Sequence, residues 1–290
     1  MLAPIERLKG PLLLLVLFAV AACKPNPTPQ QACTLGANGG NPVIIVAGTF
    51  SPAIANEIAL GTSLYAAGHT HCVLELKGEE AWGELPGTIN IDISAAALKV
   101  FVDDVLDWAG ESKVDLVGHS QGALAARSYI KKFGGALNVD TMVSLSGPNR
   151  GTNFAALLSY ADPLLAPFGI TCESVEPCTQ MILDSDWVTD LNAGDMTPGD
   201  VDYYAFYTNN DQLVWYWGTG LFGFPVIKYD NAELGPGATN MELGEQCPLR
   251  VVGHLGMIFD PVPIHMTLDA LAGRPISVPL PTCFLPPVVI

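Results

Sequence analysis

A serine between two glycines is the first feature of this sequence that could do chemistry. Residues 118–122 read Gly-His-Ser-Gln-Gly and fit the pattern G-x-S-x-G. The match alone is weak evidence, because 29 of the 290 residues are glycine. Its position is more informative, since an expected strand over 113–117 precedes it and an expected helix over 123–133 follows it. A sharp turn there, with Gly118 and Gly122 leaving room for the bend, would expose the Ser120 hydroxyl as a nucleophile.

A serine nucleophile needs a general base and an acid that orients the base. In strand–turn–helix sites of this kind the chain order is serine, acid, histidine, and of the five histidines only His254 and His265 follow the serine. His254 lies among glycines in an expected loop, whereas His265 begins an expected last helix, so His254 is the predicted base. Asp211 follows the expected strand over 203–208 and is the predicted acid. Three other aspartates remain alternatives for that role: Asp200, Asp202 and Asp230.

Two backbone N–H groups are expected to stabilise the negative oxygen that forms when a serine attacks an ester carbonyl. One belongs to Gln121, the residue after the nucleophile. The second is expected on the loop after the first strand, where Thr49 follows Gly48. An ordinary strand-to-helix turn is the alternative interpretation of that loop.

The elements that must position these groups alternate along the chain. Strands are expected at 42–47, 72–77, 113–117, 141–145 and 203–208, and helices at 52–67, 94–108, 123–133 and from 263. Repeated strand–helix alternation predicts an α/β fold, with a mostly parallel central sheet and helices on both faces. Ligands of such sheets bind at the carboxyl ends of the strands, which is where Ser120 and Asp211 are expected.

The segment between the fifth strand and the acid is long for a compact domain. Residues 151–200 are interpreted as a cap-like, acyl-binding insertion, because they are rich in apolar residues. Residues 213–224, which follow Asp211, are also apolar and aromatic. Such residues beside an ester site favour apolar acyl esters over charged or sugar substrates, although ordinary core positions remain an alternative for any one of them.

The N-terminal residues have the features of an export signal. Arg7 and Lys9 precede an apolar run over 12–22, which is too short to cross a membrane as a helix. The run ends at Cys23 in a sequence that resembles the lipobox of bacterial lipoproteins, which implies cleavage before Cys23 and its lipidation. The expected organisation is a signal peptide (1–22), a proline-rich tether (23–41) and a catalytic domain (42–290). An ordinary signal peptide is the alternative.

Cysteine usage fits an exported protein. Seven cysteines are an odd number, and removing Cys23 leaves six that can form disulfides. Fifteen pairings are possible in principle. The predicted pairs are Cys172–Cys178, which encloses a short loop, with Cys33–Cys72 and Cys247–Cys283.

The charge balance narrows the possible partners. The chain has 13 basic and 29 acidic residues, a net charge of −16. A surface of this sign repels phosphate backbones, so we expect no nucleic-acid partner. It also disfavours electrostatic docking on anionic lipids, so any membrane association has to come from the lipid anchor or from apolar surface.

Taken together, these motifs resemble the lipase class 2 group of secreted bacterial lipases, which are α/β-hydrolases acting on carboxylic esters. The resemblance covers most of residues 42–275 and includes residues 42–49, 113–122 and 247–262. It implies Ser120 as nucleophile, Asp211 as acid and His254 as base. Three positions depart from the common pattern of the group: Ala47, Ala123 and Arg150.

The resulting expectation is a lipid-anchored, exported serine esterase or lipase that uses an acyl-enzyme and needs neither a cofactor nor a metal. Its substrate would be a lipid or another apolar ester, and the chain would be a monomer. Alternatives on the same fold are a polyester depolymerase or an acyltransferase. An alternative from another class is a lipid-binding lipoprotein without catalysis.

Overall fold

The computed structural model of the chain describes residues 26–78 and 85–286. The predicted signal peptide (1–22), the predicted lipidation site Cys23 and the first residues of the predicted tether lie outside the described residues. Within the described part, no helix is both long and apolar enough to cross a membrane.

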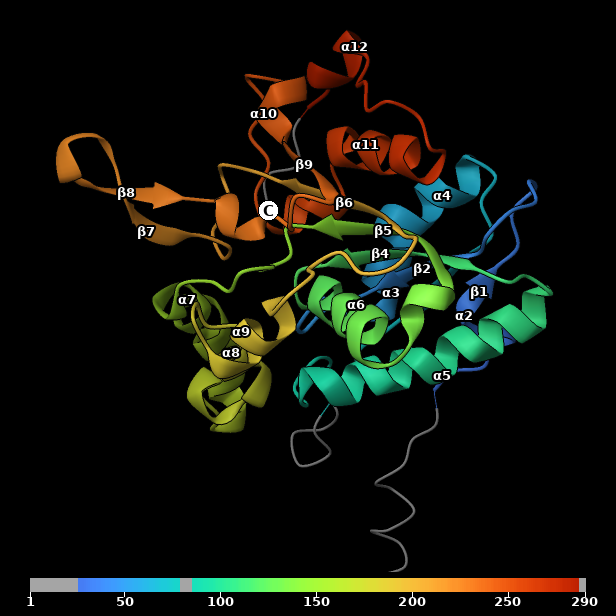
Figure 1. The fold of residues 1–290 in the computed structure, drawn as a ribbon, viewed down its shortest axis with the longest axis horizontal. Helices are drawn as coiled ribbons and strands as arrows, with labels where there is room; N and C mark the ends of the chain where they lie inside the picture. Colours follow the sequence, from blue (N-terminus) through green and yellow to red (C-terminus); the bar gives the residue numbers. More distant parts are fainter. Residues whose placement is uncertain (1–25, 79–84, 287–290) are drawn as a thin grey trace, which may run out of the picture.

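A seven-stranded sheet forms the centre of the molecule (Figure 1). Its strand order is β1-β3-β2-β4-β5-β6-β9, and every neighbouring pair is parallel except β1 with β3. This confirms the predicted mostly parallel sheet. The strands are β1 (Cys33–Thr34), β2 (Val43–Val46), β3 (His71–Leu74), β4 (Val114–His119), β5 (Val139–Leu145), β6 (Asp202–Tyr207) and β9 (Ala238–Glu242).

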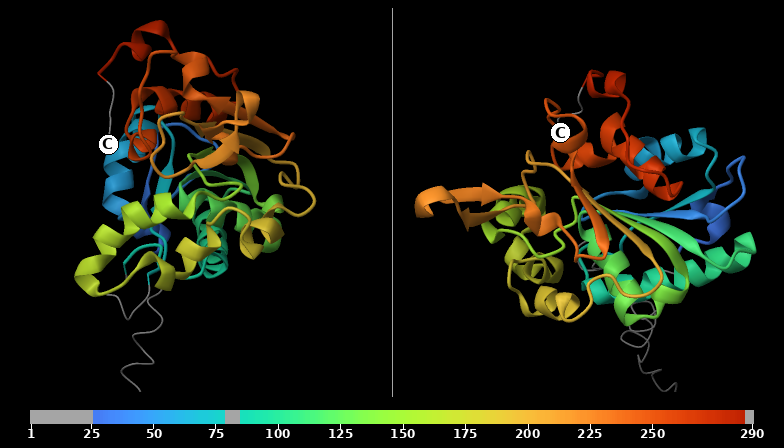
Figure 2. Two further views of the ribbon diagram at one scale, coloured as in Figure 1. Left: turned by 90° about the vertical axis from the view of Figure 1, so that its left-hand side faces the viewer. Right: turned by 45° about the horizontal axis from the view of Figure 1, so that its top comes forward.

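Helices cover both faces of the sheet, as the alternating pattern predicts (Figures 1 and 2). One face carries α2 (Pro29–Ala32), α5 (Ile91–Ala109) and α6 (Gln121–Lys132). The other carries α11 (Pro261–Leu271) and a continuous helical segment made of α3 (Ala53–Asn56), one π-helical turn (Glu57–Gly61) and α4 (Thr62–Ala66). The remaining short helices of the carboxyl-terminal part are α10 (Leu243–Gln246) and α12 (Leu280–Cys283).

Alternating side chains of β2 show how one sheet supplies two cores. Ile44 and Val46 pack on the α5 and α6 face, whereas Val43 and Ile45 pack on the α4 and α11 face. All four side chains are buried, and the sequence of β2 is accordingly a continuous apolar run without the polar alternation of a strand that has one face in water. The β4 strand that leads to Ser120 is therefore held from both sides.

The segment between β5 and β6 forms its own group of helices: α7 (Phe154–Leu165), α8 (Glu176–Gln180) and α9 (Asp186–Asn192). They lie together beside the sheet in both views (Figures 1 and 2). Three disulfides have the predicted pairing: Cys33–Cys72, Cys172–Cys178 and Cys247–Cys283. The second closes a loop within this helical group, and the third ties the segment before His254 to α12.

The structure also differs from the sequence-based expectations in several elements. The strand expected over 72–77 ends at Leu74. The helix expected from residue 94 begins at Ile91, because the Asn90 side chain accepts the backbone N–H of Asp92 and caps it there. Two strands of the sheet, β1 and β9, were not expected. A separate hairpin of β7 (Tyr216–Thr219) and β8 (Pro225–Lys228) was not expected either. Since β1 pairs with β3, part of the predicted tether segment belongs to the sheet.

Candidate active site

Ser120 sits at a sharp turn between β4 and α6. Its backbone has φ 54° and ψ −125°, a conformation that a non-glycine residue adopts rarely and at a cost in free energy. The flanking glycines are required by close backbone contacts. A Cβ on Gly118 would lie 2.5 Å from the Cα of Ala123, and one on Gly122 would lie 2.1 Å from the carbonyl oxygen of Val46. The turn therefore has the geometry of a nucleophile elbow.

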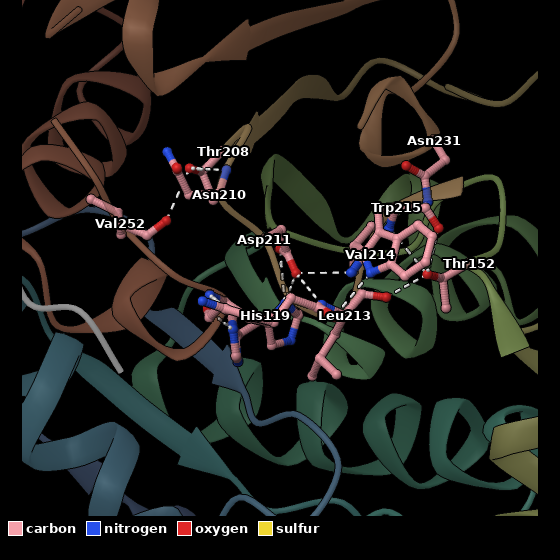
Figure 3. A network of polar contacts seen from close by, with 12 residues as sticks. His119, Thr152, Thr208, Asn210, Asp211, Leu213, Val214, Trp215, Asn231 and Val252 are labelled. Carbon is pink, nitrogen blue, oxygen red and sulfur yellow. Dashed lines mark hydrogen bonds and ion pairs between the residues drawn. The ribbon is translucent and has the colours of Figure 1, made fainter. Parts of the chain in front are cut away.

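Asp211 and His254 form a buried pair, although 43 residues separate them in the chain. The Nδ1–H of His254 donates to the carboxylate of Asp211, with both oxygens at 2.9 Å. The same carboxylate accepts the backbone N–H groups of Leu213 and Val214, each at 2.8 Å (Figure 3). Burial alone would raise the pKa of Asp211, but His254 and these two N–H groups outweigh it and hold the pKa below its ordinary value.

The backbone around His254 is fixed by polar side chains from other segments. The N–H of His254 donates to Oε1 of Gln212 at 2.9 Å, and its carbonyl accepts Nε2–H of His119 at 3.0 Å. The Thr208 hydroxyl donates to the carbonyl of Val252 at 3.0 Å (Figure 3). With the backbone held in this way, the imidazole directs Nδ1–H toward Asp211, and the other ring nitrogen, Nε2, is then the one that can accept a proton.

His119, the residue before Ser120, acts here as an uncharged neighbour. It is fully buried, and its ring centroid lies 4.9 Å from that of His254. Burial, together with the nearby His254, lowers the pKa of His119 to about 3. The ring is therefore neutral near pH 7 and carries its proton on Nε2, where it donates to the carbonyl of His254.

The two expected oxyanion donors lie close to each other. Gln121 is the first residue of α6, at the end of the helix where N–H groups lack partners within the helix. Its side chain accepts a hydrogen bond from the Thr49 hydroxyl, which joins the loop after β2 to the elbow. Phe50 continues that loop with a positive φ of 56° and donates its N–H to the carbonyl of Pro86 at 2.8 Å.

A single pocket at the carboxyl ends of the strands brings these residues together. Ser120, His254 and Thr49 all line it, and Asp211 lies behind His254. Most of the other lining side chains are apolar: Phe50, Pro148, Leu157, Cys178, Met181, Leu213, Val214 and Leu255. Leu157, Cys178 and Met181 come from the 151–200 segment that was expected to contact an acyl chain. No Lys, Arg, Asp or Glu belongs to the described residues that line this pocket.

The alternative site residues are placed elsewhere. His265 lies on α11, with Nε2 3.6 Å from Asp269. Asp202 begins β6 and is exposed, so it lies at the end of the strand opposite to Asp211. The carboxylate that binds the His254 ring is that of Asp211, rather than that of Asp200, Asp202 or Asp230.

Sequence reasoning missed three residues that shape the site: His119, Gln212 and Phe50. His119 and Gln212 contact the backbone of a residue 135 and 42 positions away, respectively, so no local pattern could indicate them. Phe50 has a left-handed backbone that is rare for an aromatic residue, which gives no sequence signal. Chemically, a nucleophile elbow, an aspartate–histidine pair and an apolar pocket suit the transfer of an acyl group to serine.

Solved structures show that this fold is the α/β-hydrolase fold. Aspergillus fumigatus lipase B is 20% identical with a TM-score of 0.62, over 86% of this chain and 58% of that chain. The mature form of the Bacillus licheniformis lipase BlEst2 is 17% identical with a TM-score of 0.52, over 80% of this chain and 91% of that one. The carboxylesterase CesB of Bacillus subtilis is 14% identical with a TM-score of 0.50, over 83% of this chain and 87% of that one.

The chain spans 58% of the length of the Aspergillus fumigatus enzyme and 54% of the propeptide form of BlEst2. At these identities the likeness concerns the fold, and it confirms the predicted α/β-hydrolase architecture.

Within the α/β-hydrolase fold, the sequence also identifies a family. The sequence pattern of the lipase (class 2) family matches residues 40–232, which is more than half of the chain. The chain belongs to this family, and the predicted resemblance is confirmed. Ser120 and Asp211 lie inside the matched range, whereas His254 lies beyond it.

Proposed function

We propose that this chain is a serine ester hydrolase that acts on uncharged esters with apolar acyl groups through an acyl-enzyme. The observation that carries the proposal is the buried Asp211–His254 pair beside a pocket that Ser120 also lines. The family, and the lipases and the carboxylesterase that share the fold, support the same reaction class.

In the proposed reaction, Nε2 of His254 takes the proton of the Ser120 hydroxyl as Oγ attacks the ester carbonyl carbon. The backbone N–H groups of Gln121 and Thr49 stabilise the resulting negative oxygen. His254 then gives its proton to the leaving alcohol, which departs as the acyl-serine ester forms. A water molecule, deprotonated by His254, attacks the carbonyl carbon of this ester. The bond to Oγ of Ser120 then breaks, Oγ takes the proton from His254, and the carboxylic acid is released. Asp211 stabilises the imidazolium in both half-reactions.

The side chains that line the pocket favour a substrate with an apolar acyl group. Leu157, Met181, Leu213 and Val214 offer aliphatic contacts beside Ser120. A charged acyl group would lose its hydration there without gaining an ion pair from the described lining residues. The cap-like role of the 151–200 segment is part of this proposal, because Leu157 and Met181 belong to it.

Labelling with a fluorophosphonate tests the mechanism directly. We expect one phosphonate per chain on Ser120, since the reagent reacts with a serine that an adjacent base activates. Ser120→Ala should remain unlabelled, whereas Ser51→Ala, the matched control at the other serine that lines the pocket, should label fully. Mass spectrometry of the labelled peptide reads the site. An unlabelled wild-type chain would leave a binding protein without catalysis as the better description.

We further propose that Cys23 carries a lipid that anchors the exported enzyme to a membrane. The motivation is the lipobox-like sequence that ends at Cys23, and three disulfides fit an exported protein. Cys23→Ser should move the protein from the membrane fraction of expressing bacteria to the soluble fraction, as blotting after ultracentrifugation would show. Unchanged partitioning would contradict the anchor. Cys33→Ser is no control, because Cys33 is in a disulfide. The control is Leu137→Ser, which changes an exposed leucine, keeps Cys23 and should stay in the membrane fraction.

A further inference from the structure

The hairpin of β7 and β8 projects away from the body of the molecule, on the side where α7, α8 and α9 lie (Figures 1 and 2). It is a two-stranded antiparallel sheet that does not join the central sheet. A two-stranded hairpin alone gains little stability in water, so its sequence needs an explanation other than core formation.

The end of this hairpin is apolar and exposed. Leu221, Phe222 and Phe224, here called the hairpin tip, are 78%, 89% and 69% exposed. Behind the tip, Trp217 pairs with Ile227 across the strands, and these side chains are 58% and 45% exposed. Single exposed apolar residues are common, but large ones gathered at one protruding end mark a contact surface.

The tip also holds an aromatic residue in an unfavourable backbone conformation. Phe222 has φ 59°, in the left-handed region where glycine or asparagine is the usual residue. The turn is closed by the N–H of Gly220, which donates to the carbonyl of Phe224 at 2.7 Å. A bulky residue kept at such a position without burial indicates that its side chain is needed outside the molecule.

The base of the hairpin is connected to the candidate active site. The Asp211 carboxylate binds the N–H groups of Leu213 and Val214, two residues that line the pocket. The next residue, Trp215, donates its N–H to the Thr152 hydroxyl at 3.2 Å (Figure 3). The carbonyl of Trp215 accepts the N–H of Asn153 at 3.0 Å. These hydrogen bonds therefore hold the base of the hairpin in a fixed position relative to the pocket.

The charge distribution indicates what the tip contacts. Residues 213–227 contain no charged side chain, although the chain as a whole has a net charge of −16. An anionic membrane would repel the protein body. A stable protein partner needs roughly 800 Å² of matching surface with polar groups around it, which a narrow, convex and uncharged tip does not offer. An uncharged liquid ester surface requires neither charge nor matching shape.

We propose that the hairpin tip inserts into the surface of aggregated, uncharged lipid esters and so holds the pocket at the substrate phase. This inference rests on the proposed ester-hydrolase function and adds the physical state of the substrate. Leu221, Phe222 and Phe224 enter the droplet, and Trp217 lies at the boundary, where tryptophan is favoured because one end of its ring is apolar and the other polar.

Tributyrin tests the proposal, because one compound can be supplied dissolved or, above its solubility limit, as droplets. The tip variant is Leu221→Ser/Phe222→Asn/Phe224→Ser, in which asparagine suits the left-handed position. The matched control changes three other exposed leucines: Leu35→Ser/Leu137→Ser/Leu280→Ser. All proteins are full chains with Cys23→Ser, so that no lipid at Cys23 contributes to droplet binding.

We expect the tip variant to keep its rate on dissolved tributyrin within twofold and to lose at least tenfold on droplets, while the control keeps both rates. An unchanged droplet rate, or an equal loss in both states, would overturn the inference. So would a change in sedimentation coefficient between wild type and tip variant, because the tip would then contact a second copy.

A separate measurement keeps docking apart from catalysis. Full chains carrying Ser120→Ala should float with triolein droplets, and the tip changes should raise the droplet concentration for half-maximal flotation at least tenfold, which corresponds to about 1.4 kcal/mol. Flotation that depends on the tip, with no Ser120-dependent hydrolysis of dissolved ester by wild type, would refute the proposed function and support docking. Ser120-dependent hydrolysis without tip-dependent flotation would support the proposed function and refute docking by the hairpin tip.

Discussion

Asp211→Asn is expected to lower kcat for a dissolved p-nitrophenyl ester by about 10⁴-fold while the fold stays intact. The reason lies in the two oxygens of the carboxylate. Oδ1 accepts the N–H groups of Leu213 and Val214, and both Oδ1 and Oδ2 lie 2.9 Å from Nδ1 of His254. An asparagine can keep Oδ1 on the two backbone groups and thereby places its NH₂ group against Nδ1. The imidazole then carries its proton on Nε2 and cannot accept the proton of Ser120.

The same strand supplies the control for this prediction. Asp202 lies at the other end of β6 and is exposed, so Asp202→Asn should keep kcat within twofold. Ser120→Ala should fall at least as far as Asp211→Asn, because the nucleophile itself is absent. Circular dichroism and thermal unfolding verify the fold of each variant. A kcat for Asp211→Asn within tenfold of wild type would remove Asp211 from the proposed mechanism.

The candidate site could be predicted from sequence where local pattern and chain order coincide. Ser120 has strand residues before it, a helix after it and a glycine two positions away on each side, and each of these is visible within about 20 residues. Asp211 and His254 follow from the required order, together with their places after a strand and among glycines. The six disulfide cysteines pair as predicted, and each of the three pairs joins two cysteines that are consecutive in the order of these six along the chain.

The unpredicted parts depend on contacts between distant segments. β1 has two residues, Cys33 and Thr34, which is too short for any periodicity to appear. β9 reads Ala-Thr-Asn-Met-Glu, without the β-branched run of the central strands, and it forms because the β6 edge is available for pairing. The hairpin has three glycines among residues 218–223, and this composition predicts a loop rather than strands. The link between His119 and His254 is likewise a product of the folded chain.

Arg250→Met is expected to lower the free energy of unfolding by about 3–5 kcal/mol, the usual cost of leaving a buried charge without its partner. Arg250 and Asp260 form a buried ion pair whose side chains are 1% and 0% exposed. Nη2 lies 2.7 Å from Oδ2, and Nε lies 3.1 Å from Oδ1, so the contact is bidentate. Nη1 also donates to the carbonyls of Thr282 and Cys283 at 3.4 and 3.2 Å. Methionine fills much of the volume of arginine but removes the guanidinium that faces the buried Asp260 carboxylate.

Urea unfolding at pH 7 with the disulfides intact measures this loss, since the midpoint and slope give the free energy. Lys99→Met is the control, because Lys99 binds Asp103 at 2.6 Å with side chains that are 46% and 47% exposed, and exposed ion pairs contribute at most about 1 kcal/mol. Adding Asp260→Asn to Arg250→Met should recover at least half of the loss, because asparagine removes the buried charge and can still accept the N–H of Val262 at the start of α11. An Arg250→Met loss no larger than that of Lys99→Met would contradict the prediction. His254 lies between Arg250 and Asp260 in the chain. The expected large loss would therefore support the view that this ion pair stabilises the segment that carries His254.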